Sequence, residues 1–220
     1  MPDNTSSWTR PPVRAGLFLG LLGVLAAAPV DAQHFDGTIF AGGALMTQDL
    51  TDEFTVNVDG QIRTAVQSHD NGLALGAHLG VRWDRLAVEG TLAWIPTNLV
   101  TTIEGLEDIT EDQTILILGG NVLYDIVPGR FFDVFVAGGA GVKRYSADDP
   151  GGGFEGGMDF MFNAGLGARL ALSETLSIRM DARDYISTFD AFEDIDGSDE
   201  DAKMQHDILI TVGLRFVPGG

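Results

Sequence analysis

Residues 206–216 constrain the fold of this chain more than any other segment, because a large apolar side chain recurs at every second residue from Ile208 to Phe216. One face of an extended segment would carry Ile208, Ile210, Val212, Leu214 and Phe216. The opposite face would carry Asp207, Leu209, Thr211, Gly213 and Arg215. Successive side chains of a β-strand point to opposite faces. The segment therefore predicts a strand with one apolar face that closes on an aromatic residue.

The N-terminal residues have the layout of a secretory signal peptide. Arg10 and Arg14 precede the apolar residues 15–29, and small residues follow at the expected cleavage site. The apolar stretch is shorter than the ~20 residues of a spanning helix. The alternative, a membrane anchor, is disfavoured because no stop-transfer flank follows. We predict a signal peptide over residues 1–32 and one secreted domain over residues 33–220.

The composition excludes several classes of function. The chain has 32 acidic residues against 13 Lys and Arg, which gives a formal net charge of −19. Such a protein repels nucleic acid, so we expect no nucleic-acid partner. It has no cysteine, and this excludes disulfides, a thiol nucleophile and a cysteine-ligated metal.

Period-two alternation recurs throughout the secreted domain and predicts eight strands. Their lengths, ~10 residues, suit tilted strands that cross a hydrocarbon layer. The predicted strands cover residues 37–46, 72–83, 86–95, 114–125, 132–145, 160–170, 175–185 and 206–216.

Short and long connections alternate between these strands. The short ones are residues 84–85, 126–131 and 171–174. The long ones are residues 47–71, 96–113, 146–159 and 186–205. The prolines agree, since we expect Pro96, Pro128, Pro150 and Pro218 at strand ends or in connections. Bacterial outer-membrane barrels have this asymmetry, with long extracellular loops and short periplasmic turns.

Each oriented strand has one apolar face and one face that is polar, small or charged, although strand 37–46 is too apolar on both faces to orient. A soluble eight-stranded barrel would show the same alternation turned inside out. Aromatic residues favour the membrane alternative. On the apolar faces, those near the short turns are Trp83, Tyr124, Phe132 and Phe216, and those near the long loops are Trp94, Phe160 and Phe162. Two aromatic bands around an aliphatic belt are typical of lipid interfaces. The fold class predicted is therefore all-β, an eight-stranded antiparallel up-and-down transmembrane β-barrel.

Three segments carry a resemblance to a known family. They are VAGGAGVKRY (136–145), AGLGARLALSETLSIRMDARDYIS (164–187) and VGLRF (212–216). The secreted domain resembles the OmpA-like family of eight-stranded outer-membrane barrels. The resemblance implies a place in the outer membrane of a Gram-negative envelope. It also implies that the barrel assembly machinery reads the closing strand, with Gly213, Leu214 and Phe216 as the signal.

The polar faces supply the first candidate site, a charged lumen. The inward residues predicted are His78, Arg82, Glu89, Asp133, Lys143, Arg169, Arg179, Asp181, Arg183 and Arg215. An eight-stranded barrel is just wide enough for side chains to fill it. We therefore expect an ion-paired polar core that plugs the barrel. A gated or narrow ion path is the alternative.

Acidic loops supply the second candidate. Loop 186–205 contains seven carboxylates and one lysine, and loop 96–113 contains five carboxylates. Carboxylates suit hard divalent cations, which these loops would share with the phosphates of neighbouring lipopolysaccharide. The alternative is that the charges only solvate the loops. The spacing of an EF-hand is not met, and we predict no dedicated metal site.

Catalysis is the third candidate. Ser68-His69-Asp70 contains a nucleophile, a base and an acid, but neighbours on an extended segment point in alternating directions. We predict no catalytic residue and no cofactor. The function expected is that of a monomeric outer-membrane barrel with a structural or surface-interaction role. A porin-like narrow passive pore is the alternative, and a lipid A-modifying enzyme comes third.

Overall fold

Ten β-strands make up the described part of the molecule. The computed structural model describes residues 34–47, 53–147, 157–189 and 203–218. The strands are β1 (His34–Met46), β2 (Phe54–Val58), β3 (Gln61–His69), β4 (Gly72–Trp83), β5 (Leu86–Ile103), β6 (Ile109–Val127), β7 (Phe132–Ala147), β8 (Met158–Ala171), β9 (Leu176–Phe189) and β10 (Lys203–Phe216). Within these ranges, the chain has no helix with the length and apolarity needed to cross a membrane. The predicted signal peptide, residues 1–32, lies outside the described residues and stays a prediction.

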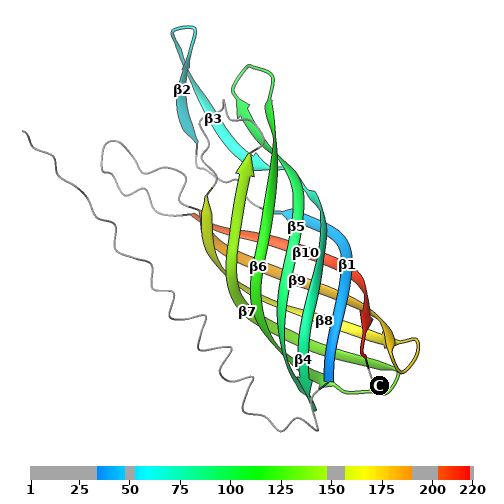
Figure 1. Ribbon diagram of the computed structural model, residues 1–220. Coiled ribbons are helices and arrows are strands. Elements are labelled where there is room, and N and C mark those ends of the chain that lie inside the picture. Colours follow the sequence, from blue (N-terminus) through cyan, green and yellow to red (C-terminus); the bar gives the residue numbers. More distant parts are fainter. Residues whose placement is uncertain (1–33, 48–52, 148–156, 190–202, 219–220) are drawn as a thin grey trace, which may run out of the picture. The chain divides into compact units, whose positions relative to one another are not determined.

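Eight of the strands close into an antiparallel barrel. They follow one another in the order β5-β4-β1-β10-β9-β8-β7-β6, and the pairing of β6 with β5 closes the ring. The first and last strands pair from Gly37↔Phe216 to Met46↔Asp207. In Figure 1 the strands run obliquely around one barrel. The predicted eight-stranded fold is confirmed, and each predicted strand lies within one of the barrel strands to within a residue.

Three short connections lie at one end of the barrel, which we call the short-turn end. They are residues 84–85, 128–131 and 172–175, close to the predicted positions. Asp84 has a φ of 49°, a left-handed conformation that Asp tolerates in tight turns. The other end, where the sequence predicts long connections, is the long-loop end.

The connection predicted over residues 47–71 is not one continuous loop. It contains the hairpin of β2 and β3, closed by Asp59 and Gly60 with φ of 53° and 80°. An Asp-Gly pair supplies the two positive φ angles that a two-residue hairpin turn requires. The prediction of a loop is therefore wrong over residues 54–69.

The connection predicted over residues 96–113 is also mostly strand. β5 continues to Ile103 and β6 begins at Ile109, and β3 pairs with this extension of β5. Together these segments form a four-stranded sheet that reaches beyond the barrel (Figure 1). We call it the projecting sheet, residues 54–69 and 97–113.

Pro96 lies inside β5 rather than at a strand end, which corrects a prediction. The β4–β5 pairing ends at Trp94 and the β3–β5 pairing begins at Leu99. Pro96 falls between the two ladders, so its missing N–H removes no hydrogen bond from either of them.

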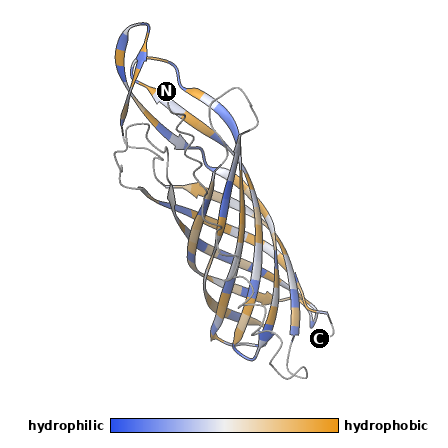
Figure 2. Cartoon of the chain, turned by 60° about the vertical axis from the view of Figure 1, so that its left-hand side comes forward, coloured by the Kyte–Doolittle hydropathy of each residue, from blue (hydrophilic) through white to orange (hydrophobic). Residues whose placement is uncertain are grey.

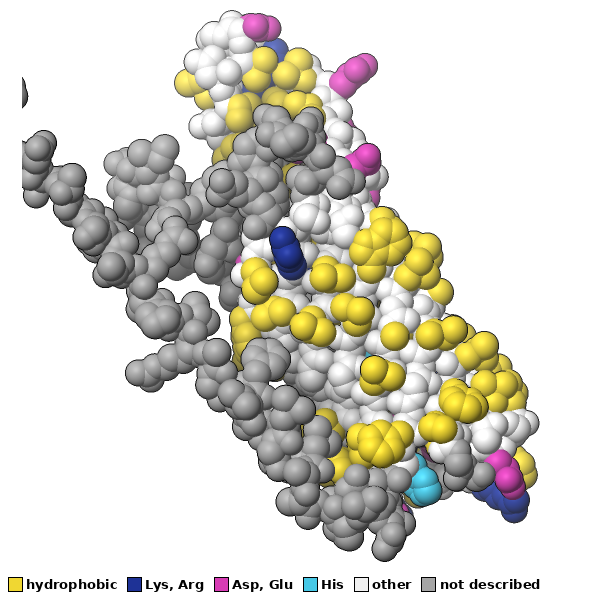
Figure 3. Space-filling view, viewed as in Figure 1, with side chains coloured by type: hydrophobic (Ala, Val, Ile, Leu, Met, Phe, Trp, Pro, Cys, Tyr) yellow, Lys and Arg dark blue, Asp and Glu magenta, His cyan; other side chains and the backbone are white. Residues whose placement is uncertain are grey.

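The barrel wall separates an apolar outer face from a polar inner face. Hydrophobic and hydrophilic residues alternate along the strands in Figure 2, and apolar side chains are spread over the barrel surface that is visible in Figure 3. β1, which the sequence leaves unoriented, turns Asp36, Thr38 and Phe40 inward and Phe35 and Ile39 outward. Phe40 reaches the lumen because Gly76 lies beneath its ring, where an added Cβ would come within 2.4 Å of Phe40 Cζ.

The predicted aromatic bands lie on the outer face. Trp83 is half-buried there, and the exposed members are Trp94, Tyr124, Phe132, Phe160, Phe162 and Phe216. The structure adds Phe35 and Phe131 at the short-turn end. Beyond Trp94 the outward residues of β5 become Asn98, Val100 and Thr102. This change marks the upper limit of the apolar belt and leaves the projecting sheet above it.

Candidate functional site: the ion-paired lumen

The ten side chains predicted to face the lumen all lie on the inner face of the barrel. The buried ones are His78, Glu89, Lys143, Arg169, Arg179, Asp181 and Arg183. The partly exposed ones, at the short-turn end, are Arg82, Asp133 and Arg215. Six of the ten are Arg or Lys and three are carboxylates. This set alone would leave an excess of buried positive charge.

Three further carboxylates restore the balance. Asp36, Asp125 and Asp207 are buried on the inner face. They pair with Arg215, with Arg82 and Arg169, and with Lys143, respectively. Among the described residues, these ion pairs join six cations to six carboxylates. Balanced pairing is what allows charges to be buried at all.

The sequence pattern misses these three residues for identifiable reasons. Asp36 lies one residue outside the predicted strand 37–46, and Asp125 is the last residue of the predicted strand 114–125, on the face opposite Tyr124. Asp207 falls on the polar face of the closing strand but stands beside an apolar residue, Leu209, on that face. The available signal was the charge count, because six inward cations require more than three carboxylates.

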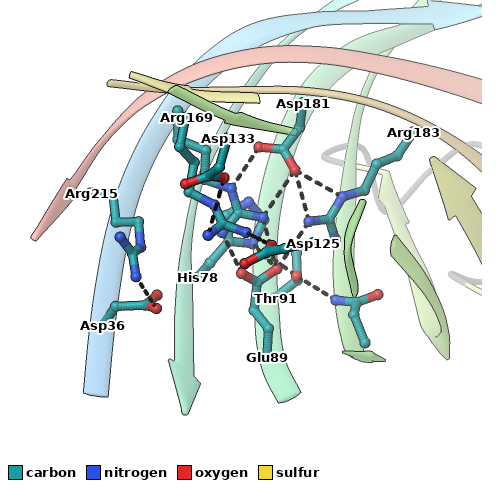
Figure 4. Close-up of polar contacts among 12 residues, drawn as sticks. Asp36, His78, Glu89, Thr91, Asp125, Asp133, Arg169, Asp181, Arg183 and Arg215 are labelled. Carbon is teal, nitrogen blue, oxygen red and sulfur yellow. Dashed lines mark hydrogen bonds and ion pairs between the residues drawn. The ribbon is translucent and has the colours of Figure 1, made fainter. Parts of the chain in front are cut away.

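Glu89, Arg179, Asp181 and Arg183 form what we call the central cluster. Figure 4 labels Glu89, Asp181 and Arg183 of this cluster. Arg179 Nε and Nη2 donate to Asp181 at 2.8 and 2.9 Å, and Arg179 Nη1 pairs with Glu89. Arg183 Nη2 lies 3.0 Å from Glu89 Oε1 and 2.8 Å from Asp181 Oδ1. Each guanidinium thus binds both carboxylates, a geometry that the planar donor fork of arginine favours.

The central cluster spans the barrel. Glu89 is on β5, whereas the other three members of the cluster are on β9. Three strands separate β5 from β9 in either direction around the ring. The two strands are therefore on opposite sides, and the Glu89–Arg179 contact crosses the lumen.

His78 extends this cluster toward β6. Its Nδ1 lies 2.9 Å from Thr91 Oγ1 and 3.3 Å from Glu89 Oε1, and Asn121 Nδ2 donates to Thr91 Oγ1 at 2.8 Å. The ring of Phe40 stacks on His78 with a centroid separation of 4.5 Å. These contacts fix the histidine side chain from both sides.

A second group of ion pairs lies at the short-turn end. Arg82 and Arg169 both pair with Asp125, at 2.9 Å for Arg169, and Arg169 Nη1 lies 3.4 Å from Asp133. Arg169 also connects this group to the central cluster through an aromatic ring.

That ring belongs to Phe135. The guanidinium carbons of Arg169 and Arg179 lie 4.4 and 5.0 Å from its centroid, within the range of a cation–π contact. Phe135 occupies this position because Gly167 faces it on β8, where an added Cβ would lie 2.3 Å from Phe135 Cζ. The glycine therefore makes room for an aromatic link between two charged groups.

A third polar group lies toward the long-loop end. Lys143 pairs with Asp207 and also donates to Gln205 Oε1 at 3.4 Å. The same Gln205 oxygen accepts a 3.0 Å hydrogen bond from the hydroxyl of Tyr145. These residues join β7 to β10 across the inside of the barrel.

His69, on β3 of the projecting sheet, lies over this third group. Its Nε2 bonds to Gln113 Oε1 and its ring stacks on Tyr145 at 5.8 Å. Burial, with a further contribution from the positive charge of Lys143, lowers the pKa of His69 to about 4, although the bond to Gln113 opposes the shift. His69 is therefore neutral at pH 7.

A set of apolar side chains, which we call the collar, lies on the inner face beside the third group, because Ile117 is the partner of Lys143 in the pairing of β6 with β7. The collar consists of Ile95, Ile115, Ile117, Met161 and Leu209, all buried. On β6 the two isoleucines lie between Gln113 and Asn121, and on β10 Leu209 follows Asp207. The inner face is therefore not uniformly polar, which the pattern of alternating strands does not predict.

The predicted assembly signal is the end of β10. Leu214 and Phe216 face outward, Gly213 faces inward, and Phe216 pairs with Gly37 of β1. These residues therefore form part of the seam where the last strand meets the first.

Ser68, His69 and Asp70 are not brought together as a triad. Ser68 and His69 lie on opposite faces of β3, and the imidazole of His69 is occupied by Gln113 and Tyr145. Asp70 uses its backbone carbonyl to accept a 2.5 Å hydrogen bond from Thr97.

The acidic loops are described only in part. Glu104, Glu107 and Asp108 are exposed at the turn of the projecting sheet, with Glu111 and Asp112 following on β6. Residues 190–202 of the other acidic loop lie outside the described residues. In the described ranges, no three His, Asp or Glu side chains lie close enough together to hold a metal ion.

A closed ring of eight strands, an apolar outer belt between aromatic bands and a polar interior define a transmembrane β-barrel of the bacterial outer membrane. The chain belongs to the outer membrane protein beta-barrel domain family, whose profile matches residues 17–216. The resemblance found in the sequence is thereby confirmed at the level of this family. The protein is located in the bacterial outer membrane.

Two solved structures illustrate the similarity of fold. The Neisserial surface protein A has a TM-score of 0.52 at 10% identity, with 84% of this chain and 97% of that chain covered. The outer membrane protein OprG from Pseudomonas aeruginosa has a TM-score of 0.53 at 18% identity, with 82% and 95% covered. No curated protein matches the chain significantly in sequence. Identities this low show a shared fold alone.

Proposed function

We propose that this protein is a non-conducting outer-membrane barrel with a structural and surface-interaction role, its lumen plugged by its own side chains. The observation that carries the proposal is the Glu89–Arg179 contact across the lumen, within a set of six paired cations and six paired carboxylates. An open polar channel would present unpaired charges to passing ions.

Electrostatics supports a closed lumen at the central cluster. An ion passing this level would have to separate guanidinium and carboxylate groups that make two or more charge-assisted bonds each. Separating one partner from a buried pair leaves an uncompensated charge, at a cost of about 3–5 kcal/mol.

The collar supports the same proposal by a different mechanism. A hydrated ion at this level would meet five buried apolar side chains and a lysine and an aspartate that already pair with each other, so it would find few hydrogen-bonding partners. Apolar constrictions close pores by excluding water. The central cluster and the collar are therefore two barriers in series along one path.

The narrow pore remains the alternative, and solute flux distinguishes it. We expect proteoliposomes containing the refolded protein to swell in isotonic sugar or salt no faster than protein-free vesicles. A sixteen-stranded porin, which has an aqueous channel, would serve as the positive control. Swelling that increases with the amount of protein would contradict the plug and favour a small-solute pore.

The surface role is proposed for the projecting sheet. Its exposed carboxylates Glu104, Glu107 and Asp108 would share divalent cations with lipopolysaccharide phosphates in the outer leaflet. We expect chelation of divalent cations to increase proteolysis of this sheet in whole outer membranes but not in phospholipid vesicles. If chelation changed the proteolysis of this sheet equally in the two membranes, that result would contradict this role.

Assembly and oligomeric state are part of the same proposal. The end of β10 would be the segment read by the barrel assembly machinery, and the inserted protein would be a monomer without enzymatic activity. Deleting the Phe216 side chain by Phe216→Ala is expected to reduce insertion in cells, while spontaneous refolding into detergent continues. A refolding defect as large as the cellular one would contradict a signalling role.

A further inference from the structure

Lys143 and Asp207 form an ion pair whose chemistry differs from that of the other charge contacts in the lumen. Among the described residues, the other five cations of these pairs are arginines, whose guanidinium groups stay charged in proteins. A lysine that loses its proton becomes an amine nucleophile. This pair alone therefore brings a group that can act as a nucleophile against a carboxyl carbon.

The pair is also the most deeply buried of the described ion pairs. The side chains of Lys143 and Asp207 are 0% and 1% exposed. Arg215 and Asp36, the other lumen pair in which one cation meets one carboxylate, are 12% and 4% exposed. Asp207 Oδ1 is buried without a hydrogen-bond partner. An ionised carboxylate that is buried with one oxygen unpaired is unfavourable.

Apolar side chains surround the pair on its own strands and the next ones. Ile117 is the partner of Lys143 on β6, Met46 is the partner of Asp207 on β1, and Leu209 of the collar follows Asp207 on the inner face of β10. Transfer of a proton from the lysine to the aspartate leaves an uncharged amine beside an uncharged carboxylic acid, and neither then requires a counter-charge. An uncharged amine is the form that attacks a carboxyl carbon.

We propose that Lys143 and Asp207 form an intramolecular amide bond once the barrel has closed. Lys143 Nζ forms a bond to Asp207 Cγ, and one of the two bonds from Cγ to oxygen breaks. The departing oxygen takes two of the three ammonium protons and leaves as water, so the reaction requires no other reactant. The amide would link β7 covalently to β10, two strands that are separated in the ring by β8 and β9.

Asp159 on β8 is placed to move a proton in this reaction. It is the partner of Lys143 in the pairing of β7 with β8 and lies on the same inner face. A neighbouring carboxyl group can accept a proton from the attacking amine and deliver it to the departing hydroxyl, which is general acid–base catalysis. The amide is independent of the proposed plug, since a mass tests the bond and a solute flux tests the plug.

Intact-mass measurement of the secreted domain, residues 33–220, tests the bond directly. The protein is measured unfolded in urea and again after refolding in detergent. We expect the full sequence mass in urea and a mass lower by one water molecule after refolding. Tandem mass spectrometry of a digest should find a branched peptide that joins residues 143 and 207. The full sequence mass in the refolded wild type would overturn the proposal.

Two variants distinguish the amide from other losses of water, such as cyclisation at an Asp-Gly sequence. Lys143→Arg keeps the positive charge but cannot form the amide, so it should keep the full sequence mass. Asp207→Asn should reach the same final mass as the wild type, because the same amide then forms with release of ammonia. The heat-dependent shift of the barrel on SDS gels verifies that each variant is folded. A loss of water that persists in folded Lys143→Arg would overturn the proposal, as would a folded Asp207→Asn that releases no ammonia.

Two further variants test the roles of burial and of Asp159. Arg215→Lys is the matched control, because it places a lysine beside Asp36 at the partly exposed short-turn end. We expect no second water to be lost there, and such a loss would show that burial does not select the reacting pair. Asp159→Asn keeps both reacting groups and should slow amide formation during refolding by about a hundredfold. An unchanged rate would overturn the role assigned to Asp159.

Discussion

Two regions of the lumen, the central cluster and the collar, are filled by different chemistry. The central cluster and its neighbours toward the short turns pair arginines with carboxylates at 2.8–3.4 Å. The collar packs isoleucine, methionine and leucine with almost no exposed surface, beside the Lys143–Asp207 pair. Charged groups require partners in fixed positions, whereas apolar groups require only the right volume. The central cluster should therefore tolerate truncation less well than the collar.

The largest effect is expected from Arg179→Ala. This change leaves Glu89 and Asp181 with fewer cationic partners in a buried site, which should lower the free energy of unfolding by about 3–5 kcal/mol. Arg144→Ala is the matched control, because Arg144 is exposed on the outer side of β7, and we expect a change below about 1 kcal/mol. Urea unfolding in phospholipid vesicles measures both. Equal effects would show that the pairing contributes nothing beyond ordinary packing.

A smaller effect is expected in the collar. Ile117→Ala should destabilise the barrel by about 2–3 kcal/mol, because the flexible side chain of Met161 can fill part of the cavity. The neighbouring Leu118 faces lipid, so Leu118→Ala leaves no internal cavity and should cost less. The same unfolding measurement compares them. A larger loss in the free energy of unfolding for Ile117→Ala than for Arg179→Ala would contradict the proposed difference between the collar and the central cluster.

Acid should loosen the contact between the projecting sheet and the barrel. The pKa of His69 falls from 6.5 to about 4 on folding, so the unfolded segment binds more protons between these values. The stability contributed by neutral His69 is present above pH 6.5 and is lost as the pH falls toward 4, by about 3 kcal/mol. Hydrogen exchange of β3 amides measures this loss. The His69→Gln variant should lack this pH-dependent loss of stability. If the variant still shows the loss, another titratable group is responsible for it.

The smallest effect is expected at the tip of the hairpin. Gly60 has a φ of 80°, so Gly60→Val should destabilise the β2–β3 hairpin by about 1 kcal/mol. Thr64→Val on β3 keeps a β-branched residue at an ordinary strand position and serves as the control. Limited proteolysis should detect faster cleavage between β2 and β3 in Gly60→Val only, with the barrel unaffected. Unfolding of the whole barrel in Gly60→Val would show that the hairpin is not an independent extension.

Alternation alone predicts the barrel and its three tight turns, because a strand in a closed ring has one lipid face and one inner face. It does not predict the end of the membrane layer, so the strands predicted over residues 86–95 and 114–125 are shorter than β5 and β6, which continue into the projecting sheet. The Asp59-Gly60 pair is a hairpin signal within the predicted loop 47–71. Partners across the lumen, such as Glu89 and Arg179, are 90 residues apart, and only the closed ring brings them together. The polarity of the residues also does not predict that apolar side chains such as Phe40 and Ile117 face the lumen, because their neighbours there come together only in the closed ring.

Single-channel conductance in a planar bilayer tests the closed lumen most directly. The set comprises the wild type, the cluster variant Arg179→Ala, the collar variant Ile115→Ala/Ile117→Ala, and their combination, each checked for folding by its heat-dependent gel shift. Two barriers in series predict a silent wild type, two silent or nearly silent partial variants, and steady conductance only in the combination. Steady ion-selective conductance in the wild type would contradict the account and identify the protein as a pore.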